Sequence, residues 1–179
     1  MSSPPIRSAF STWPQYQRRL RDMIGAMTEE QLAIRSLAQG PNSSPERWPI
    51  WATVGHMACQ RVFWLCVFAG EPGADTTPFT DAGNYCPGDD DLEHPLDAGA
   101  LVEALDSSFR IIDACLDRWT VDMLADEIRR PDLGANWVHT RGSVIQRVFS
   151  HDIYHCGELS QTLGVSGLPQ IDLWDVRGE

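Results

Sequence analysis

The apolar residues of this chain recur at intervals of three and four over most of its length. This spacing follows one face of an α-helix, which turns once in about 3.6 residues. It is clearest in four segments, near residues 13–27, 49–68, 97–119 and 140–164. We find no run with the strict alternation that is typical of a half-buried strand. The spacing therefore predicts an all-α protein, built as a four-helix bundle whose apolar faces are buried against one another.

Residues that favour helix ends stand at the ends of these segments. Asp97 and Thr140 are of the types that cap helix N-termini, and Gly70 and Gly164 are suited to the residue just past a C-terminus. Thr28-Glu-Glu-Gln31 is typical of a capping box, and it predicts a further short helix.

Proline and glycine are frequent between the helical segments. They predict a loop at residues 40–45 and a long one at residues 71–96, and loops of that length are usually functional or mobile. We expect a short helical turn and an irregular connection between residues 120 and 137. The tail at 168–174 is expected to be extended and to dock on the bundle or on a second subunit. The length of the chain indicates a single domain over residues 1–179.

Charge and cysteine content restrict the partners and the compartment. The 25 acidic and 14 basic residues give a net charge of −11, which weighs against nucleic acid and anionic membranes as partners. No apolar run approaches about 18 residues and no signal-like N-terminus is present, so we expect a cytoplasmic protein. The cysteines are odd in number and lack CxxC pairs, which favours mostly buried thiols in a reducing cytosol. They are Cys59, Cys66, Cys86, Cys115 and Cys156.

Three histidines fall on helix faces that are otherwise apolar. His151 and His155 are four residues apart, so they share one face of the last helix, and His56 lies on the corresponding stripe of the second helix. Three imidazoles converging inside a bundle would bind a divalent metal and leave a position open, as reactive metal sites do. The alternative is that each is a core histidine bonded to a carbonyl group. His94 and His139 fall in predicted loops and are expected at the surface.

Two acids beside these histidines are candidate catalytic residues. Asp152 would orient an imidazole or would be a surface acid. Glu158 would act as a general base, orient an imidazole, or remain a half-exposed helix charge. Asp152 replaces the glutamate of the zincin motif and no third histidine follows, which disfavours a metalloprotease. Cys156 is expected to be a small core residue, and Arg61 and Arg147 are candidates for binding a substrate carboxylate.

These histidines and their neighbours resemble the DinB/YfiT-like superfamily over roughly residues 10–167. The likeness is carried by Thr53-Val-Gly-His56 and by His151 and His155, with Gly157-Glu158 after them. The resemblance implies a four-helix bundle with long inter-helix loops, a metal held by the three histidines, and often a homodimer. Relatives often have a basic residue after the last histidine, where this chain has Cys156, so a cofactor contact at that position is in doubt.

The resemblance also suggests an activity. Its characterised members include transferases and isomerases that use mycothiol, bacillithiol or glutathione, and many others have no assigned reaction. We therefore expect a metal-dependent enzyme that transfers a low-molecular-weight thiol to a small-molecule electrophile, with zinc as the first choice of metal and nickel as the second. The alternatives are a hydrolase that uses metal-bound water and a non-enzymatic stress or binding protein with a structural metal.

Overall fold

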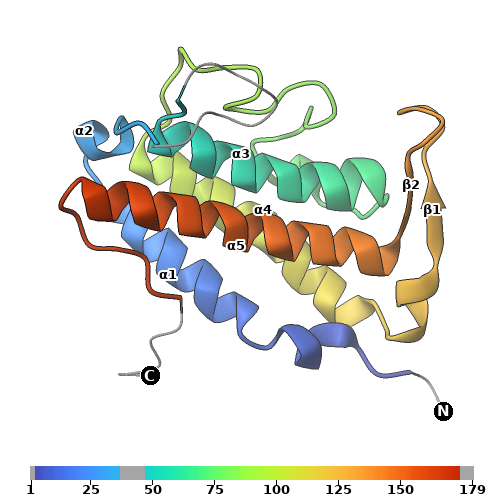
Figure 1. Ribbon diagram of the computed structural model, residues 1–179. Coiled ribbons are helices and arrows are strands. Elements are labelled where there is room, and N and C mark those ends of the chain that lie inside the picture. Colours follow the sequence, from blue (N-terminus) through green and yellow to red (C-terminus); the bar gives the residue numbers. More distant parts are fainter. Residues whose placement is uncertain (1–2, 37–46, 174–179) are drawn as a thin grey trace.

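The computed structural model describes residues 3–36 and 47–173 and is mostly helical, as the sequence predicts (Figure 1). The loop expected at residues 40–45 lies outside the described residues. Four helices have 13 residues or more. They are α1 (Trp13–Gly25), α3 (Ile50–Val62), α4 (Ala98–Arg118) and α5 (Arg141–Val165). No helix in the described ranges is both long enough and apolar enough to cross a membrane.

The predicted N-terminal caps of α4 and α5 and the predicted capping box at Thr28 are present. The prediction for Gly164 was wrong, because α5 continues to Val165 and the glycine with a positive φ (+73°) is Gly167. Asp97 accepts a hydrogen bond from the backbone N–H of Ala100 at 2.8 Å, at the start of α4. Thr140 and Ser143 form a reciprocal capping box at the start of α5. A second capping box, from Thr28, opens the short helix α2 (Glu29–Leu32). These caps satisfy backbone N–H groups that the first helical turn leaves without partners.

Helix α3 is the most buried of the four long helices. All of its residues except Gln60 are buried, as expected for a helix that is apolar nearly all round. It packs against α4 and α5, and α1 packs against α4 (Figure 1). It continues as the π-helical turn η3 (Phe63–Phe68), after which Gly70 adopts a φ of +76°. A side chain would strain that backbone conformation, so glycine is suited to end the helix there.

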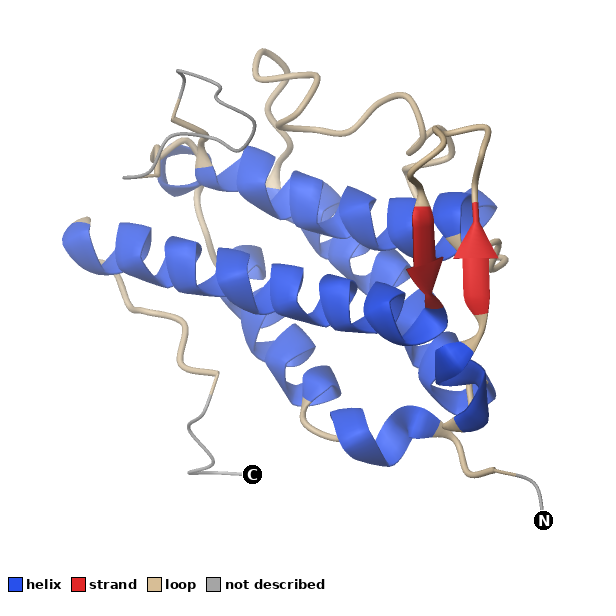
Figure 2. Ribbon diagram, turned by 45° about the vertical axis from the view of Figure 1, so that its right-hand side comes forward, coloured by secondary structure: helices blue, strands red, loops and turns tan. Residues whose placement is uncertain are grey.

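A small β-hairpin corrects the expectation that residues 120–137 form a helical turn and an irregular connection without strands. The helical turn is present as η5 (Asp122–Ala125), but β1 (Glu127–Arg129) then pairs antiparallel with β2 (Val138–Thr140). Figure 2 shows the two strands side by side at one end of the long helices. Each strand has only three residues, which is too short for an alternating pattern to be recognised.

The remaining segments cover the helices. The segment η1 (Ile6–Phe10) precedes α1, and the long loop at residues 71–96 contains one helical turn, η4 (Ala74–Thr76). In Figure 1 this loop runs along the outer side of α3. In the described part of the tail Ile171 is buried, and its carbonyl accepts a hydrogen bond from Ser160 at 3.3 Å. The tail therefore docks on this chain's own helix α5.

Candidate metal centre

Helices α3 and α5 bring His56, His151 and His155 together. One ring nitrogen from each lies within 4.8 Å of the others. Nε2 of His151 is 3.0 Å from Nε2 of His56 and 3.2 Å from Nε2 of His155. The pair spaced by four residues on α5 thus faces the histidine of α3, at the place where the two helices pack.

Two rings of the cluster are almost fully buried, and burial keeps the third, His151, uncharged. His56 and His155 are only 5% and 3% exposed. The pKa of His151 is lowered to about 2, first because burial disfavours the charged imidazolium and then because the other two rings are close. At neutral pH His151 is therefore an uncharged imidazole with a nitrogen lone pair.

Glu158 lies behind one of the rings. Its Oε2 is 2.9 Å from Nδ1 of His155, and its side chain is 16% exposed, so it is not a half-exposed helix charge. A carboxylate in this place accepts the Nδ1 proton, so Nε2 is left with its lone pair directed at the cluster. This is the geometry of the imidazole-orienting role that the sequence suggested for Glu158.

Asp89 lies behind another ring, and sequence analysis missed it. Its Oδ2 is 2.8 Å from Nδ1 of His56. The contact is within ion-pair distance but is not aligned as a hydrogen bond, so Nδ1 of this buried ring has no hydrogen bond among the described residues. The one sequence signal was the acidic run at residues 89–91 within the long loop.

A disulfide between Cys59 and Cys86 fixes this loop to α3, which corrects the interpretation as thiols for these two cysteines. The two residues are 27 positions apart and come from different elements, so spacing could not reveal the pair. Cys66, Cys115 and Cys156 remain thiols. Cys156 is buried, as expected, and burial raises its pKa to about 12.

Asp152 has neither of the locations that the sequence suggested. It is buried, its Oδ2 lies 2.9 Å from Nη2 of Arg61, and it accepts a hydrogen bond from the Trp13 indole at 3.0 Å. Arg61 also donates from Nη1 to Gln17 at 2.9 Å. The acid therefore joins α5 to α3 and α1, and Arg61 is occupied by a carboxylate of its own chain.

The chemistry of the histidine cluster fits a divalent metal. Glu158 accepts the Nδ1 proton of His155, so the Nε2 lone pair of that ring faces His151, and the Asp89 carboxylate lies 2.8 Å from Nδ1 of His56. Nε2 of His151 contacts both other rings but carries at most one proton as a neutral ring, so it cannot make two well-aligned hydrogen bonds. The 3.0 and 3.2 Å spacings are close to the roughly 3.3 Å between two nitrogen ligands of tetrahedral zinc.

Comparison with known proteins agrees with this geometry. A family model described as the DinB superfamily matches residues 13–159, a range that includes all three histidines. The chain belongs to the DinB superfamily. The crystal structure of a DinB-like protein from Bacillus cereus matches with a TM-score of 0.65 over 96% of this chain and 98% of that chain, at 14% identity, and so shows the same fold. No curated protein matches this chain significantly.

One helical turn before His151, Arg147 of this DinB chain packs on an aromatic ring. The guanidinium of Arg147 lies 4.4 Å from the centre of the Trp64 ring. Arg147 is exposed and has no carboxylate partner within the described residues. His139, expected at the surface, is half-buried in β2 with its ring 5.2 Å from Trp64. His94 is exposed, as expected.

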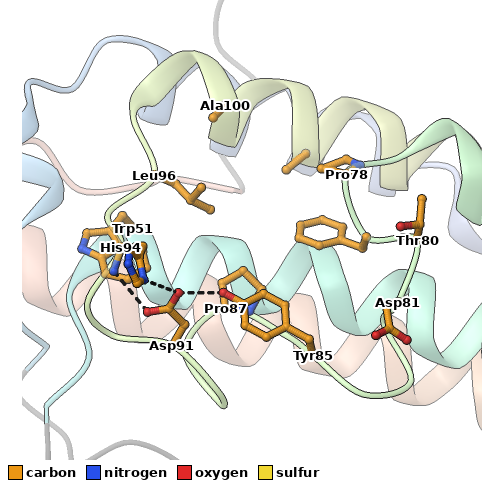
Figure 3. A pocket seen from close by; sticks show the side chains of 12 residues that line it. Trp51, Pro78, Thr80, Asp81, Tyr85, Pro87, Asp91, His94, Leu96 and Ala100 are labelled. Carbon is orange, nitrogen blue, oxygen red and sulfur yellow. Dashed lines mark hydrogen bonds and ion pairs between the residues drawn. The ribbon is translucent and has the colours of Figure 1, made fainter.

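A cavity of about 270 Å³ lies between α3, the long loop and α4 (Figure 3). Its walls are mostly apolar, with Trp51 and Leu96 among them, and none of the three clustered histidines lines it. At its edge Asp91 accepts hydrogen bonds from the Tyr85 hydroxyl at 2.7 Å and from Nδ1 of His94 at 2.9 Å. This DinB protein thus has a pocket that is separate from its candidate metal centre but shares the same loop.

Proposed function

We propose that this DinB-superfamily protein is a metal-dependent enzyme that transfers a low-molecular-weight thiol to a small electrophile. The observation that carries the proposal is the meeting of three histidine ring nitrogens, one from each of His56, His151 and His155, within 4.8 Å. Zinc is our first choice of metal and nickel the second, since neutral imidazoles suit both. We interpret the four long helices as a DinB-type four-helix bundle that supports this site.

We assign a separate role to each residue of the site. His56, His151 and His155 would hold the metal, which when bound would stabilise a thiol as its thiolate, the nucleophilic form. Glu158 holds the Nδ1 proton of His155, and it is our candidate for the general base. Asp152, the other candidate of the sequence, has a positioning role, because its ion pair with Arg61 anchors α5.

Arg147 supports a carboxylate-bearing electrophile as the substrate. Of the two arginines singled out from the sequence, Arg61 is buried against Asp152, whereas Arg147 is exposed and one helical turn from His151. Arg147 packs on the Trp64 ring but has no carboxylate partner among the described residues, and a guanidinium in that state can bind a carboxylate through two parallel hydrogen bonds. An electrophile with a carboxylate would therefore be oriented beside the histidine cluster.

Metal content tests the site. Mass spectrometry of the purified protein is expected to find about one transition-metal equivalent per chain, as for other sites with three histidines. His56→Ala and His155→Ala should lose it. His94→Ala is the matched control, since His94 is exposed and is not one of the three clustered histidines. Absence of metal from the native chain, even after reconstitution with zinc or nickel, would contradict the proposal.

A substrate panel then tests the reaction. The metal-loaded protein should accelerate conjugation of mycothiol, bacillithiol or glutathione with carboxylate-bearing electrophiles, and the two alanine variants should not. Turnover of esters or amides without added thiol would instead indicate the hydrolase. A metal that binds tightly with no turnover of either kind would indicate a binding protein with a structural metal.

Two further expectations stay predictions. A homodimer would be recognised by light scattering coupled to gel filtration. A cytoplasmic location is also untested, and the Cys59–Cys86 disulfide weighs against it, because reducing compartments keep most cysteines as thiols.

A further inference from the structure

The disulfide anchors a tight turn at residues 86–91 against α3. Cys59 lies three residues after His56 on that helix and is bonded to Cys86 of the loop. The backbone of Cys86 is bonded to Asp90 in both directions. Its N–H donates to the Asp90 carboxylate at 2.7 Å, and its carbonyl accepts from the Asp90 N–H at 3.0 Å. The residues between them are therefore held in one conformation.

This turn is packed directly on the helix and on an aromatic ring. Gly88 has a φ of +83°, and a Cβ placed there would lie 2.8 Å from the ring of Trp48. A Cβ on Gly55 of α3 would lie 2.9 Å from Pro87. The Trp48 ring in turn lies 5.0 Å from the ring of His56, centre to centre. Two glycines thus permit an approach that any side chain would prevent.

Asp89 stands inside this turn, and its carboxylate is 2.8 Å from Nδ1 of His56. A carboxylate behind a ligating imidazole fixes the tautomer and raises the basicity of the other nitrogen, and loss of such a partner typically costs about 10- to 100-fold in metal affinity. Asp89 comes from a loop rather than from a helix, so its position depends on the contacts that hold this loop against α3.

We propose that the Cys59–Cys86 disulfide is a redox clasp that holds Asp89 as a positioning residue on His56 and thereby sets the metal affinity of the three-histidine cluster. The inference rests on the metal site of the proposed function and adds its regulation. A closed disulfide restricts the loop between its cysteines, so reduction frees the turn and allows Asp89 to leave the imidazole.

A low-molecular-weight thiol would open the clasp by disulfide exchange. Its thiolate attacks Sγ of Cys86, the S–S bond breaks, and Cys59 leaves as a thiolate that takes a proton. A second thiol then attacks the mixed disulfide and releases Cys86 as a thiol. Two thiols are oxidised to one small disulfide, and one protein disulfide is reduced. Cys86 is the point of attack, because it is 4% exposed whereas Cys59 is fully buried.

The first experiment compares zinc affinity in the two redox states. The protein as isolated should give three titratable thiols after denaturation, and protein reduced with dithiothreitol and desalted under argon should give five. Competition with a chromophoric chelator then measures the zinc dissociation constant, which should rise about tenfold on reduction. A Cys59→Ala/Cys86→Ala variant should show the same rise, and it excludes new thiols as zinc ligands.

The second experiment tests whether the clasp acts through Asp89. Asp89→Asn should weaken zinc binding about tenfold in the oxidised protein but less than about twofold in the Cys59→Ala/Cys86→Ala background, because neighbours in one network are not additive. Asp81→Asn is the control. It removes the same charge from the same loop, where Asp81 is exposed and bonded to Asn84. Circular dichroism and thermal unfolding show which variants are folded.

Several outcomes would overturn the inference. They are five thiols in the protein as isolated, equal zinc affinity in both redox states, and a full effect of Asp89→Asn without the disulfide. If the double cysteine variant does not fold, the Asp89→Asn and Asp81→Asn variants can instead be compared with the native protein after all three have been reduced with dithiothreitol. Failure of the oxidised native protein to bind zinc would refute the proposed function as well. Tight zinc binding with the same affinity in the oxidised and the reduced protein would refute only the redox clasp.

Discussion

Two acids of α5, six residues apart, have opposite surroundings. Asp152 is buried in an ion pair with Arg61, whereas Glu158 meets His155 at the edge of the cluster. A buried pair contributes little to stability relative to an apolar replacement, but removal of one partner leaves a buried charge. Glu158 should have the opposite effect. Its replacement should change the stability of the fold little, because its contribution is to metal binding, through the imidazole that it orients.

Asp152→Asn should lower the free energy of unfolding by about 3–5 kcal/mol, because the Arg61 charge is left buried without a counter-ion. Urea denaturation of the metal-free protein measures this loss. Glu158→Gln is the matched variant on the same helix. It should change stability by less than about 1 kcal/mol, as partly exposed ion pairs do, and weaken zinc binding about tenfold. A loss below about 1 kcal/mol for Asp152→Asn would contradict this division of roles.

At the scale of elements, α5 is the helix on which the site depends. It supplies His151 and His155 and begins at the capping box of Thr140 and Ser143. The cap lies 11 residues before His151, so it is about three turns away. It therefore determines where the helix starts without touching the metal centre.

Thr140→Ala should destabilise the folded protein by about 1 kcal/mol, the usual cost of losing an N-cap. The zinc dissociation constant should remain unchanged, because the histidines lie in the helix interior. Thermal and urea unfolding measure the first effect, and chelator competition measures the second. Ser150→Ala, at an exposed position of the same helix, is the control and should change neither quantity. A cap variant as stable as the native chain would show that packing alone determines this helix.

At the scale of the whole molecule, folding couples the protonation of His151 to stability. The pKa of His151 falls from 6.5 to about 2 on folding, mainly because the ring is buried. Between these values the unfolded chain binds a proton that the folded chain does not. The stability contributed by this ring is therefore fully present above pH 6.5 and is lost as the pH falls toward the folded value.

The metal-free protein should thus lose stability below the ordinary pKa of histidine by up to about 1.4 kcal/mol per pH unit for each such proton. Urea denaturation at a series of pH values measures the slope. His151→Gln removes the titrating ring and should give a shallower slope, while His94→Ala should not. Equal slopes for the native protein and His151→Gln would show that His151 is not the group responsible.

The sequence by itself determined what depends on local order. Periodicity identified the long helices, cap residues identified where α4 and α5 begin, and the spacing of His151 and His155 placed both on one face. It even indicated that His56 faces the same interior. These features were accessible because side-chain direction around a helix axis follows from residue number alone.

Only the tertiary structure decided which residues each helix face contacts. The contact of Asp89 with His56, the Cys59–Cys86 disulfide and the partners of Asp152 all join residues of different elements. The short β-hairpin likewise depends on chain reversal rather than on pattern. Periodicity gives the direction of a side chain relative to its own helix, but the neighbour in that direction is set by how helices and loops pack, and packing is a property of the whole chain.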